Sequence, residues 1–279
     1  MISHHLLERE KLLMICWRWK ESMTSFDKMH GNGNDFVVIN SIKKDLVLRK
    51  SLIKKLSDRN RGIGFDQLIL ISVPTKDNHD FSVKFFNADG GEASMCLNGI
   101  RSAASYIWRH DFAPKKSIII KTKNRLVICK PVGNKIRVDI KISEVYKNDS
   151  LYKKISGDIS HQFDFVDSGN MHLCIKQSSI KNEDMNALYK NLARYIKPLQ
   201  CNLSIYRVSK DKIDIRTYEN GVGETLSCGS ASLAVASLCI KHKCSVKSSG
   251  GALDFKKKNN DTMEMIGPAE FVFSGSFDD

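Results

Sequence analysis

An internal repeat is the feature of this sequence that most constrains its fold. The segment Gly33–Ile39 resembles Gly169–Ile175, with a displacement of 136 residues from Asn34 to Asn170. A second match relates two segments in which an aromatic residue stands five positions before Gly-Glu-x-x-x-Cys. These segments end at Cys96 and Cys228, 132 residues apart. Because both matches have the same order and nearly the same displacement, the sequence predicts two similar halves.

Periodic patterns predict the strands. Polar and apolar residues alternate over Lys135–Ile142 and Lys212–Arg216, as expected for half-buried strands. Shorter apolar segments at Ser117–Ile120 and Phe81–Phe86 predict two more strands.

A helix is predicted after each repeated cysteine. Apolar residues recur at i, i+3, i+4, i+7 and i+8, starting from Ile100 in the first half and from Ala231 in the second. The second helix also has apolar residues off this stripe, so we expect it to be buried on most sides. A third, amphipathic helix is predicted over Met185–Ile196, before Pro198. The fold class is therefore α+β: two pseudo-symmetric halves, each a sheet or barrel wrapped around a central helix.

Composition indicates a folded, non-membrane protein. With 279 residues, 42% hydrophobic and 27% charged, the chain is neither collagen-like nor wholly disordered. It has no apolar run near the roughly 20 residues that span a bilayer. The first 22 residues mix acidic with basic side chains and resemble neither a secretory signal nor a transit peptide, so we expect a cytoplasmic protein. Residues 1–23 are interpreted as a dispensable extension, with an ordered helix as the alternative, and polar Ser143–Ser160 as the linker.

The net charge of +13 could attract nucleic acid or an acidic small molecule. The lysines are scattered, however, and lack the aromatic pattern of an RNA-binding module. We interpret them mainly as solvated faces, so nucleic acid is an unlikely partner.

The cysteines fall into two groups. No CxxC pair occurs, and neither a zinc site nor a disulfide scaffold is predicted, so no metal is expected. Cys129, Cys174, Cys239 and Cys244 lie in apolar patterns typical of buried small side chains. Cys16 and Cys201 carry no signal.

Cys96 and Cys228 differ from the others because each precedes a predicted helix at an equivalent repeat position. Unpaired backbone N–H groups at a helix start can lower a thiol pKa and can hold a substrate carboxylate. If the halves face each other, one thiolate can remove the proton from the carbon next to that carboxylate while the other thiol delivers a proton from the opposite side. Such a pair would invert a stereocentre without a cofactor. A disulfide between them is the alternative, as an oxidised, inactive form.

Five segments together resemble the diaminopimelate epimerase family: Lys28–Phe36, Gly62–Gln67, Phe86–Cys96, Gly169–His172 and Gly221–Ser230. The resemblance covers nearly everything from residue 26 to 275. It implies a cofactor-independent two-thiol epimerase that interconverts LL- and meso-diaminopimelate, in the biosynthesis of lysine and peptidoglycan. It also implies that the strand at 270–273 returns to the first half. The N-terminal half would then be residues 24–141 with 267–277, and the C-terminal half 142–266.

The resemblance also implies roles for individual residues. Cys96 and Cys228 would be the acid/base pair, with His172 and Glu219 as the polar groups that orient or polarise them. The side chains that match the substrate pocket are Asn34, Gln67, Asn87, Asn170 and Asn202. The helix starts that would hold the α-carboxylate are represented by Asn98, Gly229 and Ser230.

Four positions depart from the family pattern. Leu97 and Ala231 replace glycines, and Met171 replaces a proline. Asn220 stands where the family carries an arginine that pairs with the distal carboxylate of the substrate, so a bidentate charged contact is lost. These departures, at Leu97 and Asn220 above all, leave open a relaxed amino-acid racemase acting on glutamate or aspartate. A basic nucleic-acid-binding protein that has lost catalysis is the more remote alternative. The expected partner is a small amino acid, and a homodimer is left open.

Overall fold

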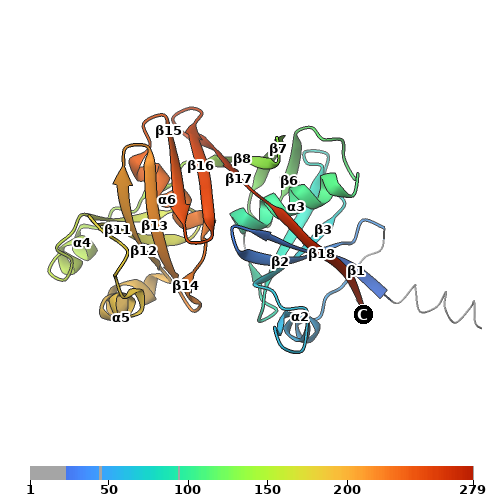
Figure 1. Cartoon of the computed structure of the whole chain (residues 1–279), viewed down its shortest axis with the longest axis horizontal. Helices are drawn as coiled ribbons and strands as arrows, with labels where there is room; N and C mark the ends of the chain where they lie inside the picture. The colour runs from blue at the N-terminus through green and yellow to red at the C-terminus, as the bar shows by residue number, and fades with distance from the viewer. Residues whose placement is uncertain (1–22, 44–45, 94, 279) are drawn as a thin grey trace, which may run out of the picture.

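The computed structural model describes residues 23–43, 46–93 and 95–278. Figure 1 shows two lobes side by side, the N-terminal half in blue to green and the C-terminal half in yellow to orange. The predicted extension lies outside the described residues except for Met23, at which the first strand begins, and so does Cys16.

The elements of the first half recur in the same order in the second, which has a few additional elements. The first half consists of β1 (Met23–Gly31), β2 (Asn34–Asn40), α2 (Lys50–Ser57), β3 (Gln67–Ser72), β4 (Phe81–Asn87), β5 (Glu92–Ala93), α3 (Leu97–Arg109), β6 (Ile118–Lys121), β7 (Leu126–Val132) and β8 (Lys135–Lys141). There follow β9 (Glu144–Val145), α4 (Asp149–Ile155), β10 (Phe163–Asp167), β11 (Met171–Lys176), α5 (Met185–Ile196), η1 (Lys197–Leu199), β12 (Asn202–Ser209), β13 (Lys212–Glu219), β14 (Gly223–Thr225), α6 (Gly229–Cys239), β15 (Lys243–Ser248), β16 (Gly251–Lys257), β17 (Thr262–Gly267) and β18 (Glu270–Asp278).

Strand pairing repeats between the halves. β2 pairs with β3 in parallel, β3 with β4 antiparallel, and β4 with β6 in parallel. The corresponding strands β11, β12, β13 and β15 pair in the same three ways. α2 connects the first parallel pair and α5 the second. The prediction of two pseudo-symmetric halves from the sequence repeat is therefore confirmed.

The halves exchange their last strands. β8 pairs with β17 across the junction, from Lys141 with Thr262 to Ile136 with Gly267. After β17 the chain enters the first lobe, where β18 lies along β1 (Figure 1). After β8, β9 pairs with β10 of the second half. The predicted return of the strand at 270–273 is confirmed, and the exchange explains how two separate lobes form one structure.

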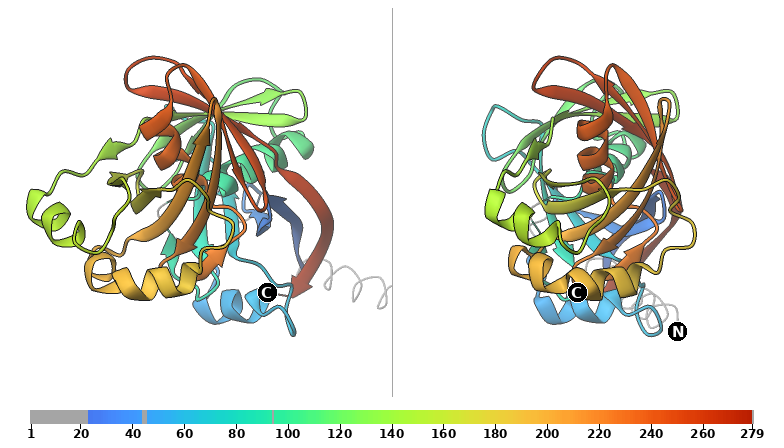
Figure 2. Two further views of the ribbon diagram at one scale, coloured as in Figure 1. Left: turned by 60° about the vertical axis from the view of Figure 1, so that its left-hand side comes forward. Right: turned by 90° about the vertical axis from the view of Figure 1, so that its left-hand side faces the viewer.

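α3 and α6 form the centre of each half. Figure 2 (right) looks into the C-terminal lobe and shows α6 surrounded by strands. Ala231, Ala234, Val235 and Ala236 are each fully buried in this helix, which confirms that it is enclosed on most sides. Small side chains allow the surrounding strands to pack closely on a helix that has no solvent face.

The prediction of a linker over residues 143–160 was wrong. This segment contains β9 and α4, and Asn148 caps α4 by accepting a hydrogen bond from the Leu151 N–H at 3.0 Å. Ile155 is fully buried with the residues under α5. The apolar positions of one short helix are too few to show a period, but tertiary burial stabilises the helix nevertheless.

Candidate active site

The starts of α3 and α6 meet at the junction of the two halves. Asn98 donates a hydrogen bond from Nδ2 to the carbonyl of Ser227 at 3.3 Å. A Cβ built on Gly229 would lie 2.9 Å from the Cβ of Leu97, closer than real side chains approach. Glycine at 229 is therefore what allows the two helix starts to pack against each other.

A cleft of about 1230 Å³ opens at this junction. Every residue that the sequence singled out for the site lines it, except His172 and Asn202. The lining residues from that set are Asn34, Gln67, Asn87, Cys96, Leu97, Asn98, Asn170, Glu219, Asn220, Cys228, Gly229 and Ser230. Residues far apart in the sequence are thus brought to one place.

Cys96 lies immediately before α3 and is partly exposed to the cleft. Its Sγ accepts a hydrogen bond from the Gly99 N–H at 3.4 Å, and its thiol donates to Asn34 Oδ1 at 3.5 Å. Burial raises the pKa of Cys96 to about 11, even though the backbone N–H groups of the helix start oppose the shift. The sequence had suggested a lowered thiol pKa, and here desolvation outweighs the helix start.

Cys228 occupies the equivalent place before α6. Its Sγ lies 3.3 Å from Ser230 Oγ, and it is more deeply buried than Cys96. Burial, and then the nearby charge of Glu219, raise the pKa of Cys228 as well. Both thiols are free, so the disulfide alternative is not the form of this structure.

Glu219 and His172 approach the second thiol from two sides. Glu219 lines the cleft at the end of β13 and accepts a hydrogen bond from Thr225 Oγ1 at 2.7 Å. Burial raises the pKa of Glu219. His172 is fully buried behind the cleft wall, where its Nε2 lies 3.0 Å from Ser230 Oγ. Burial lowers the pKa of His172 to about 3, so this ring is neutral and reaches Cys228 only through Ser230.

Asn202 also lies behind the cleft wall. Its Oδ1 accepts a hydrogen bond from the backbone N–H of Asn220 at 2.9 Å. The side chain of Asn220 in turn accepts from the Tyr189 hydroxyl at 2.7 Å. Asn202 therefore supports the cleft wall, and the Asn220 oxygen already has a partner.

Leu97 does not narrow the cleft as a protruding side chain would. Leu97 is only 3% exposed, and its side chain packs into the central core against α6. Elsewhere in the lining, Gln67 donates from Nε2 to Asn87 Oδ1 at 2.8 Å, across the β3–β4 pair. These contacts place two amides side by side along one wall.

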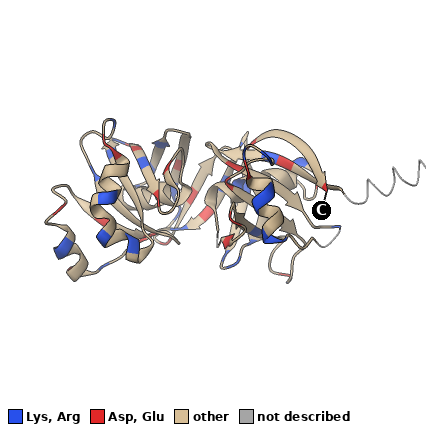
Figure 3. Ribbon diagram, turned by 90° about the horizontal axis from the view of Figure 1, so that it is seen from below, with Lys and Arg blue, Asp and Glu red and all other residues tan. Residues whose placement is uncertain are grey.

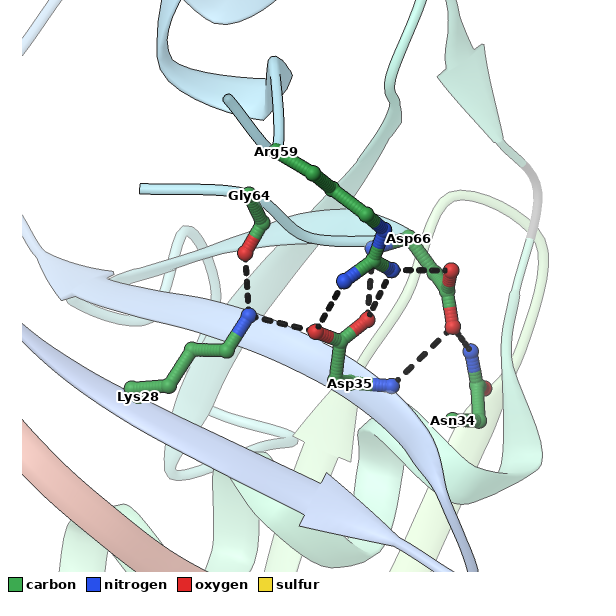
Figure 4. Close-up of polar contacts among 6 residues, drawn as sticks. All are labelled: Lys28, Asn34, Asp35, Arg59, Gly64 and Asp66. Carbon is green, nitrogen blue, oxygen red and sulfur yellow. Dashed lines mark hydrogen bonds and ion pairs between the residues drawn. The ribbon is translucent and has the colours of Figure 1, made fainter. Parts of the chain in front are cut away.

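A charged network surrounds Asp35 and Asp66 (Figure 4) and reaches the first thiol through Asn34. Arg59 binds both carboxylate oxygens of Asp35, at 3.0 and 2.8 Å, and one oxygen of Asp66 at 2.9 Å. Lys28 donates to Asp35 and to the carbonyl of Gly64. Although burial alone would raise it, the bonds from Arg59 and Lys28 lower the pKa of Asp35 to about 2. Sequence reasoning named none of these side chains as functional, although most lie inside the motifs that carried the resemblance.

Two further arginines were missed. Arg101 is fully buried within α3, and burial lowers its pKa to about 10. Its only signal in the sequence is a charge among the apolar residues that follow Ile100. Arg125 lines the cleft beside Gly169. Of the basic side chains in that lining, Arg125 is the one with no carboxylate partner among the described residues.

Within the described part of the chain, no three His, Cys, Asp or Glu side chains are grouped as a metal site. Nor is any described helix sufficiently long and apolar to cross a membrane.

The fold places the chain in a class of two-lobed α+β proteins that includes amino-acid epimerases. A hydroxyproline epimerase from Agrobacterium vitis superimposes with a TM-score of 0.67 at 11% identity, over 92% of this chain and 91% of that one. A PhzF-family phenazine biosynthesis protein of Bacillus anthracis gives 0.67 at 12% identity, over 91% and 99%.

Sequence comparison identifies the family within that class. Residues 26–144 match the family model for diaminopimelate epimerase. The diaminopimelate epimerase of Buchnera aphidicola is 37% identical, over 90% of this chain and 95% of that protein. That of Acinetobacter baumannii is 30% identical, over 92% and 98%. The chain belongs to the diaminopimelate epimerase family and is an epimerase.

Proposed function

We propose that this protein interconverts LL- and meso-diaminopimelate with two thiols and without a cofactor. The observation that carries the proposal is the position of Cys96 and Cys228, each directly before a helix start that lines one cleft. The names of the relatives support the substrate, and the paired thiols support the chemistry.

The reaction inverts one carbon by two proton transfers. The backbone N–H groups at the starts of α3 and α6 would hold the α-carboxylate, where negative charge develops as the proton leaves. One cysteine, as thiolate, takes the α-proton, and the other, as thiol, gives a proton to the opposite face. The enzyme ends with the protonation states of the two cysteines exchanged, and proton exchange with solvent after product release restores them for the next turnover.

The neighbours of the thiols suggest how a thiolate forms. Glu219 is the group placed to accept the Cys228 proton, because the two side chains are close enough to interact and burial raises the pKa of Glu219, which makes that carboxylate a stronger base than it is in water. His172 would fix the Ser230 hydroxyl beside Cys228. The cleft, at about 1230 Å³, exceeds the roughly 300–1,000 Å³ of most small-molecule sites. We therefore propose that the two halves close on the substrate and exclude water.

The distal end of the substrate needs a different partner from the usual arginine. Asn220 has no charge, and its oxygen is bonded to Tyr189. Arg125 lines the same cleft, has no carboxylate partner among the described residues and would serve a distal carboxylate. The second candidate, racemisation of glutamate or aspartate, rests on the loss of the arginine at 220 and requires that Arg125 does not select the longer substrate.

Proton NMR in deuterium oxide tests the proposal. The reduced protein is incubated with LL-diaminopimelate, and loss of the α-proton and appearance of the meso form are followed. We expect exchange in the wild type and in Cys239→Ala, whose thiol lies at the end of α6 away from the cleft. We expect no epimerisation in Cys96→Ala or Cys228→Ala.

The same assay checks the alternatives. Turnover of glutamate or aspartate at a similar rate would favour the relaxed racemase, and loss of exchange after EDTA treatment would contradict cofactor independence. Lys and Arg are interleaved with Asp and Glu over both lobes (Figure 3), which disfavours the nucleic-acid alternative. A cytoplasmic location and a homodimer stay predictions.

A further inference from the structure

A chain of hydrogen bonds runs past Cys96, from Arg101 at one end to Asp66 at the other, and each link donates towards Asp66. Arg101 Nη2 donates to Asn98 Oδ1 at 2.9 Å. Asn98 Nδ2 donates to Asn34 Oδ1 at 3.4 Å. Asn34 Nδ2 donates to Asp66 Oδ2 at 2.8 Å, and Arg59 donates to the other oxygen of Asp66 (Figure 4).

The two ends of this chain determine how both amides are oriented. An arginine can only donate and an ionised carboxylate can only accept. Asn98 must therefore present its oxygen to Arg101, and Asn34 must present its nitrogen to Asp66. The oxygen of Asn34 is consequently left facing the thiol of Cys96, from which it accepts a hydrogen bond at 3.5 Å.

We propose that Asp66, held by Arg59, is a positioning residue that keeps the Asn34 oxygen on Cys96 and so favours the protonated thiol. An amide oxygen can accept from a thiol but repels a thiolate, whereas an amide nitrogen would do the reverse. An amide also cannot take the proton, unlike the Glu219 carboxylate beside Cys228. The two thiols thus have unlike neighbours: an amide oxygen that favours the protonated thiol at Cys96, and a carboxylate that can take a proton beside Cys228. The catalytic meaning of this bias depends on the proposed two-thiol reaction.

Other groups also face Cys96. Glu219 and Cys228 lie across the cleft on the second half, and the charge of Glu219 opposes the thiolate. Arg101 and the N–H groups of Asn98 and Gly99, all on α3, favour it. A substitution at Asp66 leaves these groups in place, but the charge of Asp66 also contributes to the raised pKa of Glu219. A comparison in an Asn34→Ala background is therefore needed to separate the orientation of Asn34 from this charge effect.

The substitution Asp66→Asn reverses the restraint. The Asp66 oxygen that faces Asn34 also accepts a hydrogen bond from the Asp35 backbone N–H at 3.1 Å. In Asp66→Asn the charged bond from Arg59 to the other oxygen outweighs this neutral bond, so the nitrogen of the new amide faces Asn34. Asn34 then turns its own oxygen towards residue 66 and gives up the long 3.4 Å hydrogen bond from Asn98. Its nitrogen faces Cys96, where it stabilises the thiolate. We expect alkylation of Cys96 by iodoacetamide at pH 8 to become about three- to tenfold faster, the value of one hydrogen bond. The rate-against-pH curve of Cys96 should move to lower pH by a corresponding amount.

The rate is measured without substrate, by mass spectrometry of the peptide that contains Cys96, over pH 7–11. The deciding comparison is the pair Asn34→Ala and Asn34→Ala/Asp66→Asn, which should react at the same rate as each other. An unchanged rate in Asp66→Asn overturns the proposal. An equal acceleration in the Asn34→Ala background also overturns it, because Asp66 would then act directly through its charge. Asp66→Ser is the second variant should Asp66→Asn not fold; its short hydroxyl no longer fixes the Asn34 nitrogen, so a smaller acceleration in the same direction is expected. Because no turnover is needed, failure here is separate from failure of the epimerase assay.

Discussion

Adding one methyl group at Gly229 should separate the two helix starts and impair both stability and activity. The new Cβ would lie 2.9 Å from Leu97 Cβ and 3.1 Å from Asn98 Oδ1. Carbon atoms prefer about 3.5–4.0 Å, so one helix must move by roughly 0.6 Å or more. Overpacking of this kind costs about 1–3 kcal/mol. A misplacement approaching 1 Å at a catalytic site can cost about 100-fold in rate.

We therefore expect Gly229→Ala to lower the free energy of unfolding in urea, followed by circular dichroism, by about 1–3 kcal/mol. Its kcat/KM for α-proton exchange should fall by about ten- to a hundredfold. Gly157→Ala is the matched control, since its Cβ would meet nothing nearer than 4.0 Å. In a Leu97→Gly background only the 3.1 Å contact with Asn98 Oδ1 is left, so the further change Gly229→Ala should cost clearly less than it does in the wild type. The same loss in both backgrounds, or no loss in either, would refute the packing argument.

Three further predictions concern other parts of the molecule. Asp35 ionises in the folded state with a pKa of about 2, below its value of 3.8 in the unfolded chain, so it stabilises the fold above about pH 4. That stability, about 2 kcal/mol, should be lost as the pH falls from 4 to 2. In Asp35→Asn, the midpoint of urea unfolding should change less with pH over this range than it does in the wild type. Arg125→Gln should raise the KM for diaminopimelate about tenfold or more with little change in kcat. Lys123 does not line the cleft, so Lys123→Gln should leave the KM unchanged. Equal effects of the two substitutions would show that Arg125 does not bind the distal carboxylate. Asn148→Ala should destabilise the protein by about 1 kcal/mol through loss of the α4 cap, and an unchanged urea midpoint would show that α4 does not need its cap.

The central helices and most strands could be predicted from the sequence because their patterns are long and periodic. The helix predicted over Met185–Ile196 is α5, residue for residue. α4 was missed because its sequence signals are few: Ile155 is the one buried residue among its seven, and Asn148 caps it from the preceding position. Burial against α5, which no local pattern contains, is what makes that segment helical.

The candidate site shows the same division. The repeat placed Cys96 and Cys228 at equivalent helix starts, and the structure brings both to one cleft. The sequence did not indicate that His172 and Asn202 lie behind the cleft wall. Nor did it indicate that Asp66 and Arg101 orient the amides of Asn34 and Asn98. Those relations depend on which side of a strand faces the cleft and on contacts between residues far apart in the chain.

The sequence by itself determined the two-half design, the position of the thiols at two helix starts and the family, because each is recorded in local order and spacing. The tertiary structure alone decided the state of those thiols. Helix starts taken in isolation favour thiolates, but packing of the two halves removes water from both sulfur atoms and raises the pKa of each. Desolvation is a property of everything that surrounds a group, and it therefore becomes visible only when the chain is folded.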